Sequence, residues 1–73
     1  MQKGDVVKSL KGRDKDCIYV VIYVENGMAY LANGRNRKVE NPKKKNAKHL
    51  EVVSVSDGEL VVSDLNLRKY CRV

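Results

Sequence analysis

Short apolar runs separated by polar turns recur along this chain, and several alternate with the period of two that is typical of β-strands. The longest run, residues 17–24, is rich in Val and Ile and is apolar at successive positions. It therefore predicts a strand that is buried on both faces, since β-branched residues favour strands and have low helix propensity. Similar runs predict further strands at residues 5–10, 28–32, 50–55 and 59–62.

Two Asn-Gly pairs and one Pro predict how the central strands are connected. Asn26-Gly27 predicts a type I′ hairpin turn after the longest run, because both residues tolerate positive φ. Asn33-Gly34 predicts a second turn of the same kind, so we expect residues 35–39 to form a third antiparallel strand. Pro42 would end this strand because proline cannot donate to a ladder. Residues 43–48 are then expected to be a basic connector.

The C-terminal segment is compatible with two structures. Ser63 or Asp64 could cap a short helix over residues 65–71. Alternation of Leu65 and Leu67 is also compatible with a strand. With 73 residues the chain makes one small domain with a thin core. Five or so short strands joined by tight turns predict a mainly β fold, either a small antiparallel β-barrel or a strongly bent sheet.

Charge is concentrated in one segment, residues 35–49. It holds seven of the fifteen Lys and Arg residues and one of the nine acids, so its net charge equals the +6 of the whole chain. The other residues carry eight basic and eight acidic side chains and sum to zero. A neutral body with its excess charge in one segment is typical of a protein that binds a polyanion.

Two stretches of the chain resemble a known family. Gly4-Asp5-Val6-Val7-Lys8-Ser9-Leu10-Lys11-Gly12-Arg13-Asp14-Lys15, followed by Tyr19-Val20-Val21, is similar to a KOW motif. Pro42-Lys43-Lys44-Lys45-Asn46-Ala47-Lys48-His49-Leu50 resembles a pattern specific to small bacterial KOW-type RNA-binding proteins and to large-subunit ribosomal proteins of eukaryotes and archaea. The resemblance covers residues 3–52 and implies an SH3-like β-barrel that binds ribosomal or ribosome-associated RNA.

One position departs from the family pattern. The family normally has Gly directly after the last Lys of the motif, and here that position is Asp16. If the position needs positive φ, Asp is a tolerable replacement at some cost in strain. If Gly lets a phosphate approach the backbone, Asp16 would instead repel that phosphate. Asp14 and Asp16 also offset the cations of loop 11–16 and leave it at a net +1.

The candidate RNA-binding residues share long side chains that can donate to phosphates, since Arg grips phosphate with its fork and Lys acts as a point charge. A solvated loop that only aids solubility is the alternative. The candidates in the basic segment are Arg35, Arg37, Lys38, Lys43, Lys44, Lys45, Lys48 and His49, and those that would flank it are Lys11, Arg13 and Lys15.

Several residues in and near this segment have two interpretations. His49 could contact RNA, but we favour a structural role that fixes the connector. Asn41 and Asn46 could add donors and acceptors to the surface, or could serve turns. Tyr19 and Tyr23 are expected on one face of the main strand, with Tyr30 on the next. These rings could stack on bases, but we favour a position in the wall of the barrel. The protein would then recognise the RNA backbone rather than the bases.

Other functional classes find little support. The chain has no Walker loop, Gly-x-Ser-x-Gly or HExxH motif, so we expect no enzyme, cofactor or small-molecule substrate. Cys17 and Cys71 have no paired spacing, which makes a metal site improbable and favours reduced thiols in the cytoplasm. We also expect no signal peptide, and the longest apolar run is too short to span a bilayer. The rival hypothesis is a protein-interaction module whose basic segment docks on an acidic surface of a translation or transcription complex.

Overall fold

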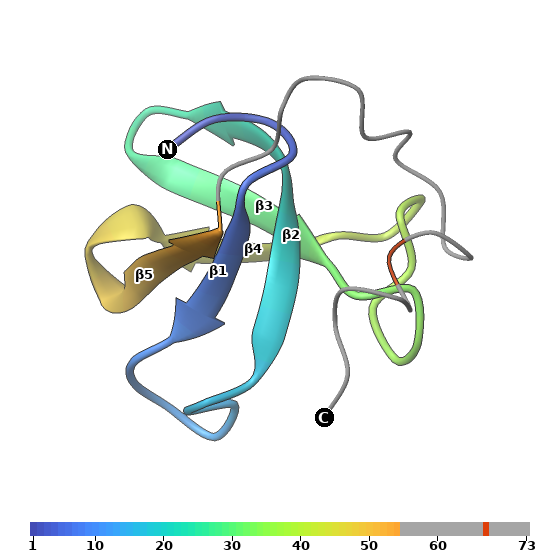
Figure 1. Cartoon of the computed structure of the whole chain (residues 1–73). Coiled ribbons are helices and arrows are strands. Elements are labelled where there is room, and N and C mark those ends of the chain that lie inside the picture. The colour runs from blue at the N-terminus through green and yellow to red at the C-terminus, as the bar shows by residue number, and fades with distance from the viewer. Residues whose placement is uncertain (55–66, 68–73) are drawn as a thin grey trace.

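The computed structural model describes residues 1–54 and 67, and these form one antiparallel sheet with the strand order β4-β3-β2-β1-β5 (Figure 1). A three-residue 3-10 turn, η1 (Ala47–His49), joins the last two strands. The strands are β1 (Val6–Ser9), β2 (Ile18–Glu25), β3 (Met28–Ala32), β4 (Lys43–Asn46) and β5 (Leu50–Ser54).

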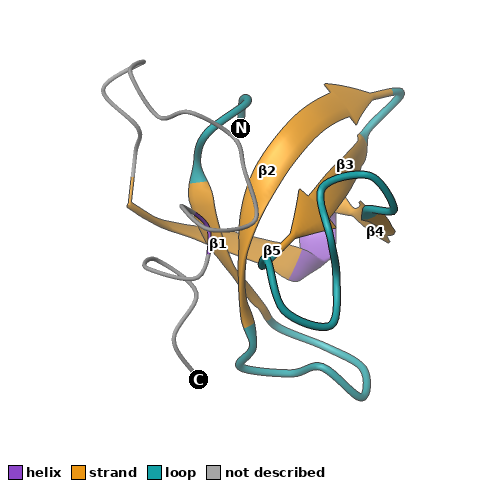
Figure 2. Ribbon diagram, turned by 90° about the vertical axis from the view of Figure 1, so that its right-hand side faces the viewer, coloured by secondary structure: helices purple, strands orange, loops and turns teal. Residues whose placement is uncertain are grey.

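The sheet is strongly curled because its two edge strands, β4 and β5, are consecutive in the chain. Only η1 separates them, so the sheet must bend until its two edges come near each other (Figure 2). Two backbone hydrogen bonds hold η1 in place, from the Ala47 amide to the Gly27 carbonyl at 3.0 Å and from the Leu10 amide to the His49 carbonyl at 2.8 Å. The expected mainly β fold, a small antiparallel barrel-like sheet of short strands, is confirmed.

The first half of β2 is buried on both faces, as its continuous apolar run predicts, whereas Tyr23, Val24 and Glu25 at its end are exposed. On the inner face, Tyr19 and Val21 pack in a cluster whose other members are Val7, Ala29, Leu31 and Leu50. On the outer face, Val20 packs in a second cluster with Val6, Ala32 and Leu67. Val39 lies against this second cluster, so the sheet has apolar contacts on both sides.

The β2–β3 hairpin forms as its sequence predicts. Asn26 and Gly27 both have positive φ, 52° and 77°, as a type I′ turn requires. Within this hairpin the register departs from simple alternation at a β-bulge between Val21 and Tyr23 of β2. Tyr23 consequently pairs with Tyr30, and the predicted placement of Tyr19 and Tyr23 on the same face is wrong.

The prediction for residues 33–48 is wrong in its element boundaries. No strand forms over residues 35–39, and the expected connector contains β4 instead. Asn33 does not have positive φ, although Gly34 does at 75°, so this Asn-Gly pair is not a type I′ turn. Pro42 precedes β4 rather than ending a strand, a position where its missing amide costs no ladder bond.

The C-terminal predictions lie almost wholly outside the described residues. The expected strand at 59–62 lies outside them, as does the helix or strand at 65–71 apart from Leu67. Leu67 is fully buried in the outer cluster. No helix within residues 1–54 and 67 is long and apolar enough to cross a membrane.

Candidate nucleic-acid interface

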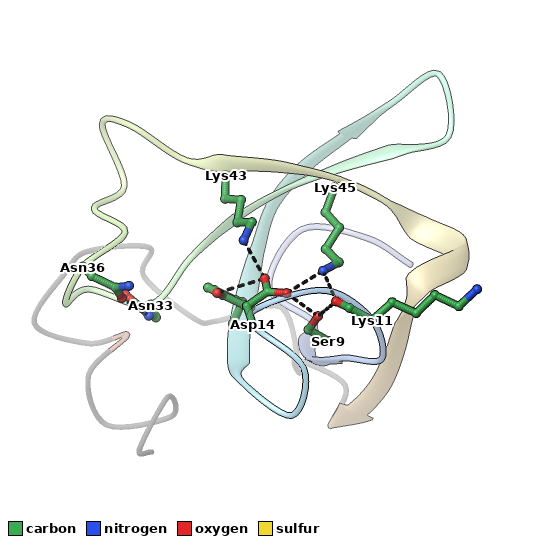
Figure 3. A network of polar contacts seen from close by, with 8 residues as sticks. Ser9, Lys11, Asp14, Asn33, Asn36, Lys43 and Lys45 are labelled. Carbon is green, nitrogen blue, oxygen red and sulfur yellow. Dashed lines mark hydrogen bonds and ion pairs between the residues drawn. The ribbon is translucent and has the colours of Figure 1, made fainter.

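A buried carboxylate, Asp14, joins loop 11–16 to the lysines of β4. It is only 8% exposed, although it lies in the loop between β1 and β2. Lys43 Nζ donates to its Oδ2 at 2.7 Å and Lys45 Nζ to its Oδ1 at 2.6 Å, both from β4 (Figure 3). The hydroxyls of Ser9 and Tyr19 also donate to it, at 2.8 and 3.2 Å.

These contacts keep Asp14 ionised. Burial by itself would raise the pKa of the Asp14 carboxyl, but the hydrogen bonds from Lys43, Lys45 and Ser9 outweigh burial and hold this pKa well below its usual range. Burial raises the pKa of the Tyr19 phenol, and the negative charge of Asp14 raises it further. The Tyr19 hydroxyl therefore keeps its proton and remains a donor.

The Asp14 contacts join two segments that are far apart in the sequence. Asp14 lies 29 residues from Lys43 and 31 from Lys45. Lys45 Nζ also donates to the Lys11 carbonyl at 2.7 Å, so a single ammonium group holds both the backbone and the side chain of the loop. Loop 11–16 is therefore fixed beside β4.

The same contacts divide the three lysines of β4 between two directions. The side chains of Lys43 and Lys45 are 30% and 12% exposed and lie against Asp14. Lys44 lies between them on the opposite face of the strand and is exposed. The basic connector expected at residues 43–48 therefore contains a strand, and strand alternation turns two of its three lysines toward a buried carboxylate.

Loop 11–16 presents its cations outward while its acids have other roles. Lys11, Arg13 and Lys15 are exposed. Asp16 has φ 73°, so the position needs positive φ, the first of the two explanations for Gly in the family pattern. Its amide donates to the Ser9 carbonyl at 2.8 Å, which closes the loop. Asp16 is also exposed, so its charge remains at the surface of this loop.

Loop 33–42 carries three further candidates and is organised by Asn33, which is buried. The Asn33 side-chain oxygen accepts from the amides of Arg35 and Arg37 at 2.9 and 3.1 Å. Its side-chain nitrogen donates to the Asn36 side chain at 2.7 Å (Figure 3). Arg35 is exposed and Arg37 half-buried. Lys38 is also half-buried, and its Nζ donates to the Gly34 carbonyl at 3.3 Å.

The last two candidates belong to η1. Lys48 is exposed, and its amide donates to the Asn46 side chain at 2.9 Å, so Asn46 caps the turn. For Asn46 the structure thus supports turn chemistry. His49 is half-buried, and its carbonyl accepts from Leu10, which ties η1 to the start of loop 11–16.

Sequence reasoning missed Asp14, which it counted only as a charge that offsets nearby cations. Ser9, five residues away, donates to Asp14 and is itself fully buried. The available signal was its place two residues after Val7, on the face of the strand that alternation turns toward the core. Among the described residues, no group of three or more His, Cys, Asp or Glu side chains could hold a metal ion. Cys17 has a free thiol.

Comparison with models of known protein families found no match to this chain, and comparison with curated protein sequences found none either.

Proposed function

We propose that this protein is a non-enzymatic RNA-binding module that holds the phosphate backbone of ribosomal or ribosome-associated RNA. Support comes from the resemblance of residues 3–52 to the KOW family and from the net charge of +6. A cytoplasmic location and a part in translation belong to the same proposal.

The observation that carries the proposal is the junction at Asp14. Its ion pairs with Lys43 and Lys45 bring loop 11–16 against β4, so two basic segments meet in one region. Phosphates repeat along RNA, and binding strengthens when several cations are presented together and counterions are released. Lys11, Arg13 and Lys15 are exposed in loop 11–16, and Lys44 is exposed on the other face of β4. Arg35 and Lys48 are exposed in the segments that precede and follow β4, and Arg37 and Lys38 are half-buried in the preceding one.

The dependence of RNA affinity on salt tests this proposal. If about five phosphates are neutralised, the logarithm of the association constant falls with log salt at a slope of roughly −3.5 for single strands and −4.5 for duplexes. Filter binding with RNA at several salt concentrations measures this slope. A flat salt dependence would overturn the proposal.

Strand alternation in β4 supplies a matched pair of variants. Lys44→Ala removes an exposed cation and is expected to weaken binding to many RNA sequences alike, since phosphate contacts carry little sequence information. It should leave the free energy of unfolding within about 0.5 kcal/mol of the original. Lys45→Ala removes a partner of buried Asp14 and is expected to lower the free energy of unfolding.

A protein partner is the competing outcome. Small barrels can also dock on acidic protein surfaces through the same cations. Capture of partners from a lysate before and after ribonuclease treatment separates the two. RNA-bridged partners disappear on digestion, as the proposal requires. Partners that persist, together with no binding to purified RNA, would favour the interaction module.

A further inference from the structure

An aromatic pair lies on the outer face of the sheet, at the hairpin end of β2 and β3. The rings of Tyr23 and Tyr30 stack with centroids 4.2 Å apart and planes 11° from parallel. The two residues are direct cross-strand partners. Tyr23 is 45% exposed, whereas Tyr19, in the same strand, is buried at the inner face.

The β-bulge in β2 creates this pair. Val21 faces the inner cluster opposite Leu31, and Tyr23 would share that face if the strand alternated regularly. The extra residue at the bulge turns Tyr23 to the outer face, where Tyr30 lies. Bulges often redirect a side chain next to a functional site, and here the result is an aromatic ring open to solvent on the surface of a basic protein.

The next residue across the sheet from this aromatic pair is a cation. Lys44 of β4 is the direct cross-strand partner of Tyr30, on the side away from Tyr23. It is exposed, and it is the β4 lysine that the Asp14 ion pairs leave out. Neighbouring strands lie about 4.8 Å apart, so in the row Tyr23, Tyr30, Lys44 the two end residues are about 10 Å apart, a span that a short single strand of RNA can cover.

We infer that this row is a subsite for unpaired RNA, in which a base stacks on the Tyr23 ring and an adjacent phosphate contacts Lys44. The inference rests on the proposed function and deepens it, since it adds single-stranded RNA as the substrate class. Stacking on aromatic side chains tolerates any base, because every base has a π-face. Desolvation and the neighbouring Tyr30 raise the pKa of Tyr23, so its phenol stays neutral and does not repel phosphate.

Three RNA probes separate stacking from phosphate contact. The probes are a single-stranded uridine oligomer, an abasic oligomer of the same length and charge, and a duplex, all measured by fluorescence anisotropy. The protein is expected to bind the uridine oligomer about 5- to 150-fold more tightly than the abasic one, the range expected for one stacked base. Tyr23→Leu keeps apolar bulk without a π-face and should abolish that difference, whereas Tyr23→Phe should keep it. Duplex affinity and the salt slope should be unchanged in both variants.

Intrinsic fluorescence gives an independent readout, since the chain has four Tyr and no Trp. Uridine oligomer should quench tyrosine emission in the original protein and quench it less in Tyr23→Leu. Equal binding of uridine and abasic oligomers, or an unchanged ratio in Tyr23→Leu, would overturn the subsite and leave the phosphate-binding function standing. Absence of salt-dependent binding to every probe would instead overturn the proposed function itself.

Discussion

Asp14 shows how a single acidic residue can organise a basic surface. It accepts from two ammonium groups and two hydroxyls while nearly buried. Its charge neutralises part of the repulsion between Lys43 and Lys45, which their positions two apart on one strand face would otherwise produce. A carboxylate that lowers the net charge of the region thereby allows β4 and loop 11–16 to lie together.

Asp14→Asn is expected to lower the free energy of unfolding by about 2–3 kcal/mol. Breaking a buried ion pair costs more, about 3–5 kcal/mol, but Lys43 is partly exposed and water can solvate it. Urea unfolding measures the difference. Asp16→Asn is the matched control, since it removes an exposed charge and keeps a residue that tolerates positive φ. Equal stability of the two variants would contradict the role assigned to Asp14.

The depressed pKa of Asp14 also predicts a pH dependence. Because this pKa is lower in the folded than in the unfolded state, the folded state gains stability at pH values above the unfolded pKa of about 4. That contribution is lost progressively as pH falls below about 4. Urea unfolding between pH 2 and about 6 should show the loss. The Asp14→Asn variant should show a shallower decline, and parallel curves would count against the prediction.

At the scale of elements, β4 and its preceding loop decide which cations reach solvent. The loop is closed by the buried Asn33 side chain, not by a two-residue turn. β4 therefore begins at Lys43, and its alternation assigns Lys43 and Lys45 to structure and Lys44 to the surface. Three consecutive lysines have different roles because successive side chains of a strand point to opposite faces.

The β2–β3 hairpin gives a prediction at this scale. Gly27→Ala is expected to cost about 1–2 kcal/mol, because φ is 77° and an L-residue is strained there. No atom lies within 4 Å of the added Cβ, so the cost comes from the backbone alone. Thermal unfolding followed by circular dichroism measures it. Asn26→Gly, at φ 52°, is the companion variant and should change stability much less. A neutral Gly27→Ala would mean that the turn has another conformation.

At the scale of the molecule, apolar clusters on both faces hold a thin sheet. The inner cluster is enclosed by the curled sheet, and the outer one is covered by Val39 and Leu67. A residue beyond β5 thus contributes to the core. The exposed cations that are proposed to bind RNA belong to neither cluster, so folding does not have to desolvate them.

Leu67→Ala is expected to lower the free energy of unfolding by about 2–4 kcal/mol, since Leu67 is fully buried. Guanidinium unfolding at constant pH measures the change. Val53→Ala, at a residue that is 49% exposed, should cost well under that amount. If both variants lost the same small amount, Leu67 would not be part of the core.

Much of the fold was predictable from local patterns. The strands expected at residues 28–32 and 50–55, the Asn26-Gly27 turn and the burial of the first half of β2 on both faces follow from alternation, turn chemistry and β-branched composition. The prediction failed at residues 33–48. There the buried Asn33 side chain accepts hydrogen bonds from the loop that follows it, and Asn33 does not form a type I′ turn with Gly34. It also failed at the β-bulge, because an extra residue in one strand leaves no reliable mark on hydrophobic alternation.

The sequence by itself determined the class of fold, the net charge and the segment that carries that charge, since these depend on composition and on contacts between near neighbours. Only the tertiary structure decided that Asp14 forms ion pairs with Lys43 and Lys45, and that Lys44 remains at the surface. It also decided that the Tyr23 ring stacks on Tyr30. Each of these depends on pairing between segments that lie apart in the chain. Register and curvature determine such pairing, because a shift of one residue turns every later side chain to the opposite face.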